Sequence, residues 1–116
     1  MAVGTKKQWG RHTRWSGAGA ADTALTISTD TGRPRRLLQV AINYSAAPTQ
    51  AGATVTLNSG AGAAYDFVLN TGSANAQSTV YAPAQVILAA DDTIDVLAPA
   101  GGGVITATIA IYTEDL

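Results

Sequence analysis

Alternation of apolar and polar side chains with a period of two residues is the feature that most constrains the fold of this chain. It is clearest in residues 105–112, where every second residue from Ile105 to Ile111 is apolar. Successive side chains of a β-strand point to opposite faces, so this pattern indicates a strand with one buried face. The chain shows no convincing 3.6-residue stripe, and we therefore expect at most a turn or two of helix.

Eight segments with strand character follow one another between Thr23 and Thr113, separated by turns rich in Gly, Pro, Asn and Asp. In one of them, Tyr65, Phe67 and Leu69 are expected to share a face that points into the core. Seven or eight short strands at regular spacing predict an all-β, antiparallel, jelly-roll-like β-sandwich. The segments are 25–28, 38–44, 54–57, 65–69, 79–81, 85–88, 93–97 and 105–112.

The first residues lack this pattern and end in a run of small residues, 16–21. We predict an extended basic N-terminal arm at 1–21 and a β-sandwich domain at 22–116, since 116 residues suit a single core. The sequence has neither the apolar segment of a secretory signal nor a run of about 18 apolar residues. A protein made without cleavage and without a membrane span is therefore expected.

The formal net charge of −1 hides a strong asymmetry. All seven Lys and Arg residues lie in residues 1–36 with only two Asp, which gives that segment a formal charge of +5. Residues 37–116 carry six acidic residues and no Lys or Arg. Such asymmetry predicts an electrostatic partner for the N-terminal segment: nucleic acid, an acidic protein surface or the acidic half of a neighbouring copy.

Basic and aromatic residues are interleaved in the predicted arm. Trp and Arg are enriched at interface hot spots, which favours binding of the arm to a neighbouring protein subunit. Two alternatives stay open: the arm folds back so that both Trp cover their own sandwich, or it binds single-stranded nucleic acid, which the sequence favours least. If the arm crosses to a neighbour, its deletion leaves the sandwich folded. The predicted partner-binding residues are Lys6, Lys7, Trp9, Arg11, Arg14 and Trp15.

Few side chains of this sequence suit catalysis, because it has one His, one Glu and no Cys. His12 lies in the predicted arm, and no nucleophile or phosphate-binding motif is present. Asp91, Asp92 and Asp95 could offer oxygens to a hard cation, but calcium usually takes about six to eight ligands. We expect instead a turn in which Asp side chains accept backbone N–H groups. The sequence thus predicts no enzyme, no catalytic residue, no metal site and no cofactor.

Four stretches of the predicted sandwich carry a family resemblance. They are 41–49 (Ala-Ile-Asn-Tyr-Ser-Ala-Ala-Pro-Thr), 80–88 (Val-Tyr-Ala-Pro-Ala-Gln-Val-Ile-Leu), 98–104 (Ala-Pro-Ala-Gly-Gly-Gly-Val) and 109–112 (Ile-Ala-Ile-Tyr). With them, residues 37–116 resemble the small β-sandwich proteins encoded among the virion genes of tailed bacteriophages. Residues 88–96 are also similar to the Leu-x-x-Gly-Asp-x-Ile-x-Val turn of trimeric jelly rolls, with Asp91 in place of the Gly.

The resemblance implies a non-enzymatic virion structural protein, either a capsid decoration or cement protein or one associated with the head or tail. It implies a homo-oligomer, with a trimer favoured, that is made in the host cytoplasm and resides in the virion. The partners it implies are the major capsid protein or other virion proteins, rather than nucleic acid or a membrane.

A carbohydrate- or receptor-binding sandwich of a phage particle is the alternative function. Sugar-binding faces usually stack exposed aromatic rings on the ligand. Here Tyr44, Tyr65 and Phe67 are expected in phase with core positions, and both Trp lie in the predicted arm. Aromatic placement therefore favours the structural role.

Overall fold

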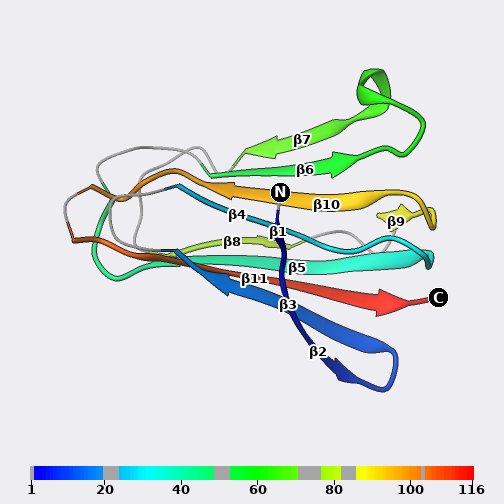
Figure 1. The fold of residues 1–116 in the computed structure, drawn as a ribbon, viewed down its shortest axis with the longest axis horizontal. Helices are drawn as coiled ribbons and strands as arrows, with labels where there is room; N and C mark the ends of the chain where they lie inside the picture. Colours follow the sequence, from blue (N-terminus) through cyan, green and yellow to red (C-terminus); the bar gives the residue numbers. More distant parts are fainter. Residues whose placement is uncertain (1, 20–23, 49–52, 71–76, 82–85, 103) are drawn as a thin grey trace.

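The chain forms two β-sheets packed face to face, with one short 3-10 helix, η1 (Ala63–Tyr65), at one end (Figure 1). The all-β antiparallel sandwich predicted from the sequence is confirmed. The described part of the chain has no helix with the length and apolar character that a bilayer crossing requires. The computed structural model describes residues 2–19, 24–48, 53–70, 77–81, 86–102 and 104–116.

Both sheets combine strands that lie far apart in the sequence. The five-stranded sheet has the order β1 (Ala2–Val3), β4 (Leu25–Ser28), β10 (Thr93–Ala98), β6 (Thr54–Asn58), β7 (Phe67–Asn70). The six-stranded sheet has the order β2 (Thr5–Trp9), β3 (His12–Ala18), β11 (Ala107–Asp115), β5 (Arg35–Tyr44), β8 (Gln77–Tyr81), with β9 (Ile87–Leu88) also paired to β5. Strands β1 and β2 therefore lie at one edge of the sandwich, and β7, β8 and β9 lie at the opposite edge.

The core sits between the central strands of the two sheets. On β11, Ala107, Ile109 and Ile111 are buried, as their period of two predicts. They face Ile94 and Val96 of β10, which are also buried. Long-range strand pairing thus places the C-terminal alternating segment in the middle of one sheet.

Strand β5 starts three residues before the predicted segment. Along this strand, the alternation of core-facing and outward-facing residues shifts by one position. The pairing with β11 shifts between Tyr112 and Thr113, which pair with Gln39 and Leu37, so Leu38 is the extra residue of a β-bulge. Leu37 is consequently buried, whereas Leu38 is only partly buried.

Residues 2–18 differ from the predicted arm, because they form three strands of the sandwich. Strand β3 pairs with β11 along its whole length, and β2 folds back on β3 through the turn at Gly10 and Arg11. Without β3, the N–H and C=O groups on that side of β11 would lack their strand partners. The eight predicted strand segments are all present, and with these three strands the described residues form eleven. The predicted domain boundary at 21/22 lies outside the described residues.

Close packing explains why residues 4 and 17 are glycines. A Cβ on Gly17 would overlap the Cδ1 of Ile27, and a Cβ on Gly4 would lie 2.8 Å from its Cγ2. Ile27 is buried and belongs to the core. The two glycines therefore leave room for a core side chain where the hairpin crosses β4.

Tyr44 fixes the end of the sandwich opposite the hairpin turn. Its hydroxyl donates a hydrogen bond to the Pro99 carbonyl at 2.7 Å. Burial raises the pKa of the Tyr44 hydroxyl above its ordinary value, which favours the protonated donor.

Candidate functional site

The six predicted partner-binding residues all lie on the β2–β3 hairpin, but on two different faces. Lys6 pairs with Trp15 across the two strands, and Lys7 pairs with Arg14. Because directly opposed side chains share a face, the first pair belongs to the core side and the second to the outer side of the sheet. Trp9, opposite His12, lies on the outer side with Lys7 and Arg14.

Trp15 is part of the core of its own chain and is completely buried. Its indole Nε1 donates to the Oγ1 of buried Thr113 at 3.0 Å. The Nζ of Lys6 and the Cζ of Arg35 lie 5.1 and 4.9 Å from its ring centroid, within the range of cation–π attraction. Trp15 therefore covers its own sandwich, which is the fold-back alternative considered for the predicted arm. This residue is not available to a partner, contrary to the sequence-based prediction.

A buried ion-pair network holds the hairpin, the β4–β5 turn and the end of β11 together. Arg35 is 4% exposed, and its guanidinium bonds Asp115 through Nε at 3.3 Å and Asp30 through Nη2 at 2.7 Å. Arg33 also reaches Asp115, at 3.4 Å. A buried cation requires such partners, since removal of one member leaves the others uncompensated. From the hairpin turn, Arg11 completes the network with a backbone pair to Asp115: its carbonyl accepts the Asp115 N–H at 2.7 Å.

Ion pairs within the chain take up part of the charge asymmetry seen in the sequence. The register of β5 and β11 puts Arg35 opposite Asp115 and Arg36 opposite Glu114. Arg36 bonds Glu114 at 2.8 Å, and His12 lies 3.3 Å from the same carboxylate. Four of the seven Lys and Arg side chains of this segment thus have a carboxylate within ion-pair distance: Lys6, Arg33, Arg35 and Arg36.

The outer face of the hairpin is the part of the predicted site that stays accessible. All five residues of β2 are exposed, and Trp9 has 56% of its surface exposed. Lys7 lies 5.5 Å from the Trp9 ring centroid, and Arg14 bonds the Tyr112 hydroxyl at 3.4 Å. Within the described residues, Lys7, Arg11 and Arg14 have no carboxylate within ion-pair distance. This face therefore combines an exposed indole with Lys7 and Arg14, while Arg11, in the adjoining turn, donates from Nε to the Asp115 carbonyl at 3.1 Å and has no ion-pair partner among the described residues.

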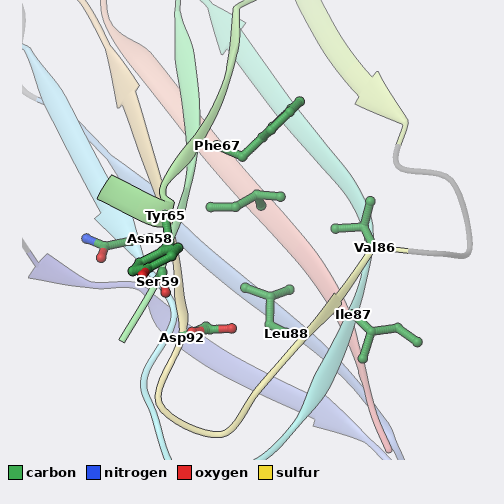
Figure 2. Close-up of a pocket in the computed structure, with 9 residues that line it drawn as sticks. Asn58, Ser59, Tyr65, Phe67, Val86, Ile87, Leu88 and Asp92 are labelled. Carbon is green, nitrogen blue, oxygen red and sulfur yellow. The ribbon is translucent and has the colours of Figure 1, made fainter. Parts of the chain in front are cut away.

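A pocket at the opposite edge of the sandwich was not foreseen from the sequence. It lies between β6–β7 of one sheet and β9 of the other and has a volume of about 290 Å³. Figure 2 shows Tyr65, Asn58, Ser59 and Asp92 on one side of it, with Val86 and Leu88 across from them. The remaining lining residues are Leu57, Phe67 and Ile87.

Two aromatic residues at this pocket correct the sequence-based prediction of the core. Tyr65 and Phe67 were expected to point inward, but they are 72% and 59% exposed, and only Leu69 packs against the core. Tyr65 belongs to η1 rather than to a strand, and Phe67 starts β7, an edge strand that pairs with β6 alone. Period two predicts which residues share a face, but it does not predict whether that face is covered. The aromatic pair beside the Gly60–Gly62 turn was the signal that could have indicated a surface site.

The polar groups of the pocket are engaged in holding its loops. The carboxylate of Asp92 accepts the N–H of Gly60 at 2.9 Å and that of Ala89 at 2.9 Å, as the predicted Asp turn requires. The Nδ2 of Asn58 donates to Asp95 at 2.8 Å. Among the described residues no group of three or more His, Asp or Glu side chains is arranged to hold a metal ion. This side of the molecule thus has rigid polar walls around an apolar floor.

Negative charge without a cationic partner surrounds this pocket. Asp66, Asp91 and Asp92 lie on its loops and Asp95 lies nearby on β10, and none has a Lys, Arg or His within ion-pair distance in the described part of the chain. Acidic side chains without an ion-pair partner therefore lie at this edge of the sandwich, and basic side chains without such a partner lie at the opposite edge.

Comparison with known proteins assigns the chain to no family. No family model matches the chain, and no curated protein matches it. A solved structure with a similar arrangement is Salmonella Typhimurium PliG, a periplasmic lysozyme inhibitor of g-type lysozyme. It is 12% identical, with 99% of this chain and 96% of that chain covered and a TM-score of 0.41. The chain is a two-sheet all-β sandwich, and this distant neighbour is not a phage protein.

Proposed function

We propose that the chain is a non-enzymatic structural protein of a bacteriophage particle, which binds a neighbouring protein subunit through the outer face of the β2–β3 hairpin. The observation that carries this proposal is Trp9, a 56% exposed indole on an edge strand, beside Lys7 and Arg14. Exposed Trp next to cations is the composition of an interface hot spot.

Lysines on an edge strand have a simpler purpose as well, since they discourage unwanted pairing with other sheets. Lys6 and Lys7 fit that purpose, but Trp9 does not, because an exposed large ring promotes association. The virion setting rests on the resemblance of residues 37–116 to phage sandwich proteins, as does a trimeric state. A nucleic-acid partner receives less support, because the face offers only three uncompensated cations and phosphate binding usually uses more.

The absence of enzymatic activity belongs to the same proposal. The one His of the sequence lies on the exposed face of β3 and bonds Glu114 at 3.3 Å. Asp92, the carboxylate at the pocket, is occupied by two backbone N–H groups. Within the part of the chain that the structure describes, neither has a hydrogen bond to a Ser, Thr or Tyr hydroxyl that it could activate as a nucleophile.

Co-sedimentation with capsids assembled from the major capsid protein of the encoding phage tests the proposal. We expect the wild-type protein to sediment with capsids and Trp9→Ala to lose at least about 30-fold in affinity, the size of a hot-spot effect. Val104→Ala is the matched control, since it also shortens an exposed apolar side chain, far from the hairpin. A wild-type protein that never sediments with capsids, or is absent from purified particles, would contradict a virion role.

A carbohydrate- or receptor-binding module is the second candidate function. It is favoured by one observation, the exposure of Tyr65 and Phe67 beside a pocket with polar walls. The aromatic placement that had argued against this function is therefore reversed for these two residues. A glycan array with specific signals that Tyr65→Ala removes would support it, whereas an array without signals would leave the structural role.

A further inference from the structure

We propose that the subunit bound by the hairpin is a second copy of this chain, whose pocket between β7 and β9 receives Trp9. This inference rests on the proposed function, because it names the partner of the same hairpin. It is drawn from the uncompensated charges and exposed apolar side chains at the two edges of the sandwich.

The geometry prevents Trp9 from reaching the pocket of its own chain. Strand β2 is one edge of the six-stranded sheet, and β3, β11 and β5 separate it from β9. Figure 1 shows the β2–β3 hairpin and the β6–β7 loop on opposite sides of the molecule. Contact between these two surfaces therefore requires two molecules.

The pocket has the chemistry that an indole needs. Leu57, Phe67, Val86 and Leu88 provide an apolar lining, and about 290 Å³ accommodates one large aromatic side chain. Three exposed apolar residues line this pocket together, an arrangement that marks an interaction surface rather than scattered single residues. They are Tyr65, Phe67 and Ile87.

Charge selects the same pairing of surfaces. Lys7, Arg11 and Arg14 accompany Trp9, and the loops of the pocket carry Asp66, Asp91 and Asp92. None of these six residues has an ion-pair partner within the residues that the structure describes. Two hairpins would repel each other, and so would two pockets, whereas hairpin and pocket attract.

A saccharide is the competing occupant, and the hydrogen bonds of the pocket disfavour it. Specific sugar binding uses polar side chains that are free to bond hydroxyl groups. Here both oxygens of Asp92 accept backbone N–H groups, and the amide of Asn58 donates to Asp95. The pocket therefore suits an apolar ring that has cationic side chains beside it better than it suits a saccharide.

The contact joins two different surfaces, so it is heterologous and leaves one hairpin and one pocket free in every pair of copies. Repetition closes a ring when the rotation between neighbours divides a full turn, and otherwise gives an open chain. A trimer, which the phage resemblance favours, is one such closed ring.

Two variants and their mixture test the inference by light scattering of the purified protein. Trp9→Ala removes the side chain that enters the pocket of the second copy but keeps the pocket itself. Phe67→Asp blocks the pocket but keeps Trp9. We expect wild-type protein to form oligomers, each variant alone to be monomeric, and the equimolar mixture to form only the heterodimer. Both positions are more than half exposed, so circular dichroism should show unchanged folding. Val104→Ala should oligomerise like the wild type.

Emission of the tryptophans gives a second measurement. Trp15 is already buried, so a shift of the emission to shorter wavelength on concentration reports the burial of Trp9. A charge reversal, Lys7→Glu, should weaken assembly about tenfold, and Asp91→Lys in the same chain should restore it.

Other outcomes overturn the inference or separate it from the proposed function. Wild-type protein that stays monomeric at millimolar concentration, or a mixture that does not associate, excludes the proposed contact. Glycan binding that Phe67→Asp abolishes assigns the pocket to a saccharide. If Trp9→Ala loses capsid binding while wild-type protein alone stays monomeric, this inference fails and the proposed function stands. If no binding to capsids occurs but the mixture still gives heterodimers, the virion role fails and the contact stands.

Discussion

The two strands of the N-terminal hairpin carry one Trp each, and the comparison between them separates structure from recognition. Trp15 on β3 is fully buried and bonded to Thr113, whereas Trp9 on β2 is 56% exposed. The difference follows from position, because β3 is paired on both sides and β2 only on one. A Trp next to basic residues therefore indicates a binding surface only where its strand lies at an edge and its side chain faces outward.

Deletion of residues 1–18 gives the largest expected effect in this comparison. It removes Trp15 from the core and leaves one side of β11 without its partner strand. We expect the truncated chain to lose its cooperative thermal transition, measured by circular dichroism. A truncated chain with a sharp transition near that of the full chain would show that β3 is a dispensable arm after all.

Trp15→Ala should have the next largest effect. Loss of a large buried side chain costs about 3–5 kcal/mol of the free energy of unfolding, because the surrounding core only partly fills the cavity. Urea denaturation followed by circular dichroism measures this change. A loss of less than about 1 kcal/mol would place Trp15 at the surface in solution.

Arg35→Met tests the ion-pair network that ties the start of β5 and the β4–β5 turn to the end of β11. Asp115 and Asp30 would lose their buried cation, and we expect a cost of about 3 kcal/mol, the low end for a broken buried pair since Arg33 still reaches Asp115. The neighbouring variant Arg36→Met is the control: that ion pair is partly exposed and should cost about 0–1 kcal/mol. Equal costs for the two variants in urea denaturation would contradict the distinction.

Gly17→Ala probes the close approach of β3 to β4 with one added methyl group. The new Cβ would overlap Ile27, and overpacking of this kind costs about 1–3 kcal/mol. The midpoint of urea denaturation should fall accordingly. The combined variant with Ile27→Val should recover part of the loss, and a lack of recovery would mean that the strain has another origin.

Trp9→Ala should have the smallest effect on folding. An exposed substitution away from buried contacts changes stability by about 0.5 kcal/mol or less. Urea denaturation of the variant in dilute solution, where it is monomeric, measures this. A cost near that of Trp15→Ala would indicate that β2 is structural throughout and would remove the basis for a binding role.

The sequence predicts the sandwich well where both neighbours of a strand are present. Ile109 and Ile111 alternate with exposed or smaller residues because β11 has one face on the core, and that phase is readable from the residues alone. The alternation wrongly predicted that Phe67 is buried, since the coverage of an edge strand depends on the opposite sheet. The alternation also did not reveal β3, because two of its core-facing residues, Thr13 and Gly17, have no large apolar side chain.

The candidate surfaces were predictable to a smaller degree. The basic and aromatic composition located the hairpin, but the split between Trp9 and Trp15 depends on pairing with β11, almost a hundred residues away in the chain. The partners of Arg35 and Arg36 were hidden for the same reason, because their register with Asp115 and Glu114 is a property of two distant strands. The pocket arises between two sheets, so the pair Tyr65 and Phe67 could indicate one wall of a surface site, but no local pattern could predict the wall that residues 86–88 supply.

The position of β11 between β3 and β5 also has a consequence for the order of folding. This strand is the last in chain order, and both of its neighbours are made long before it. Until it arrives, β3 has only β2 to pair with, and an isolated hairpin is at best marginally stable in water. Assembly of this sheet therefore waits for contacts of high sequence separation, which are the slow ones in β-proteins. During translation Trp15 stays exposed until β11 is made, so the nascent chain carries this uncovered apolar surface, a source of aggregation, throughout the synthesis of β4 to β10.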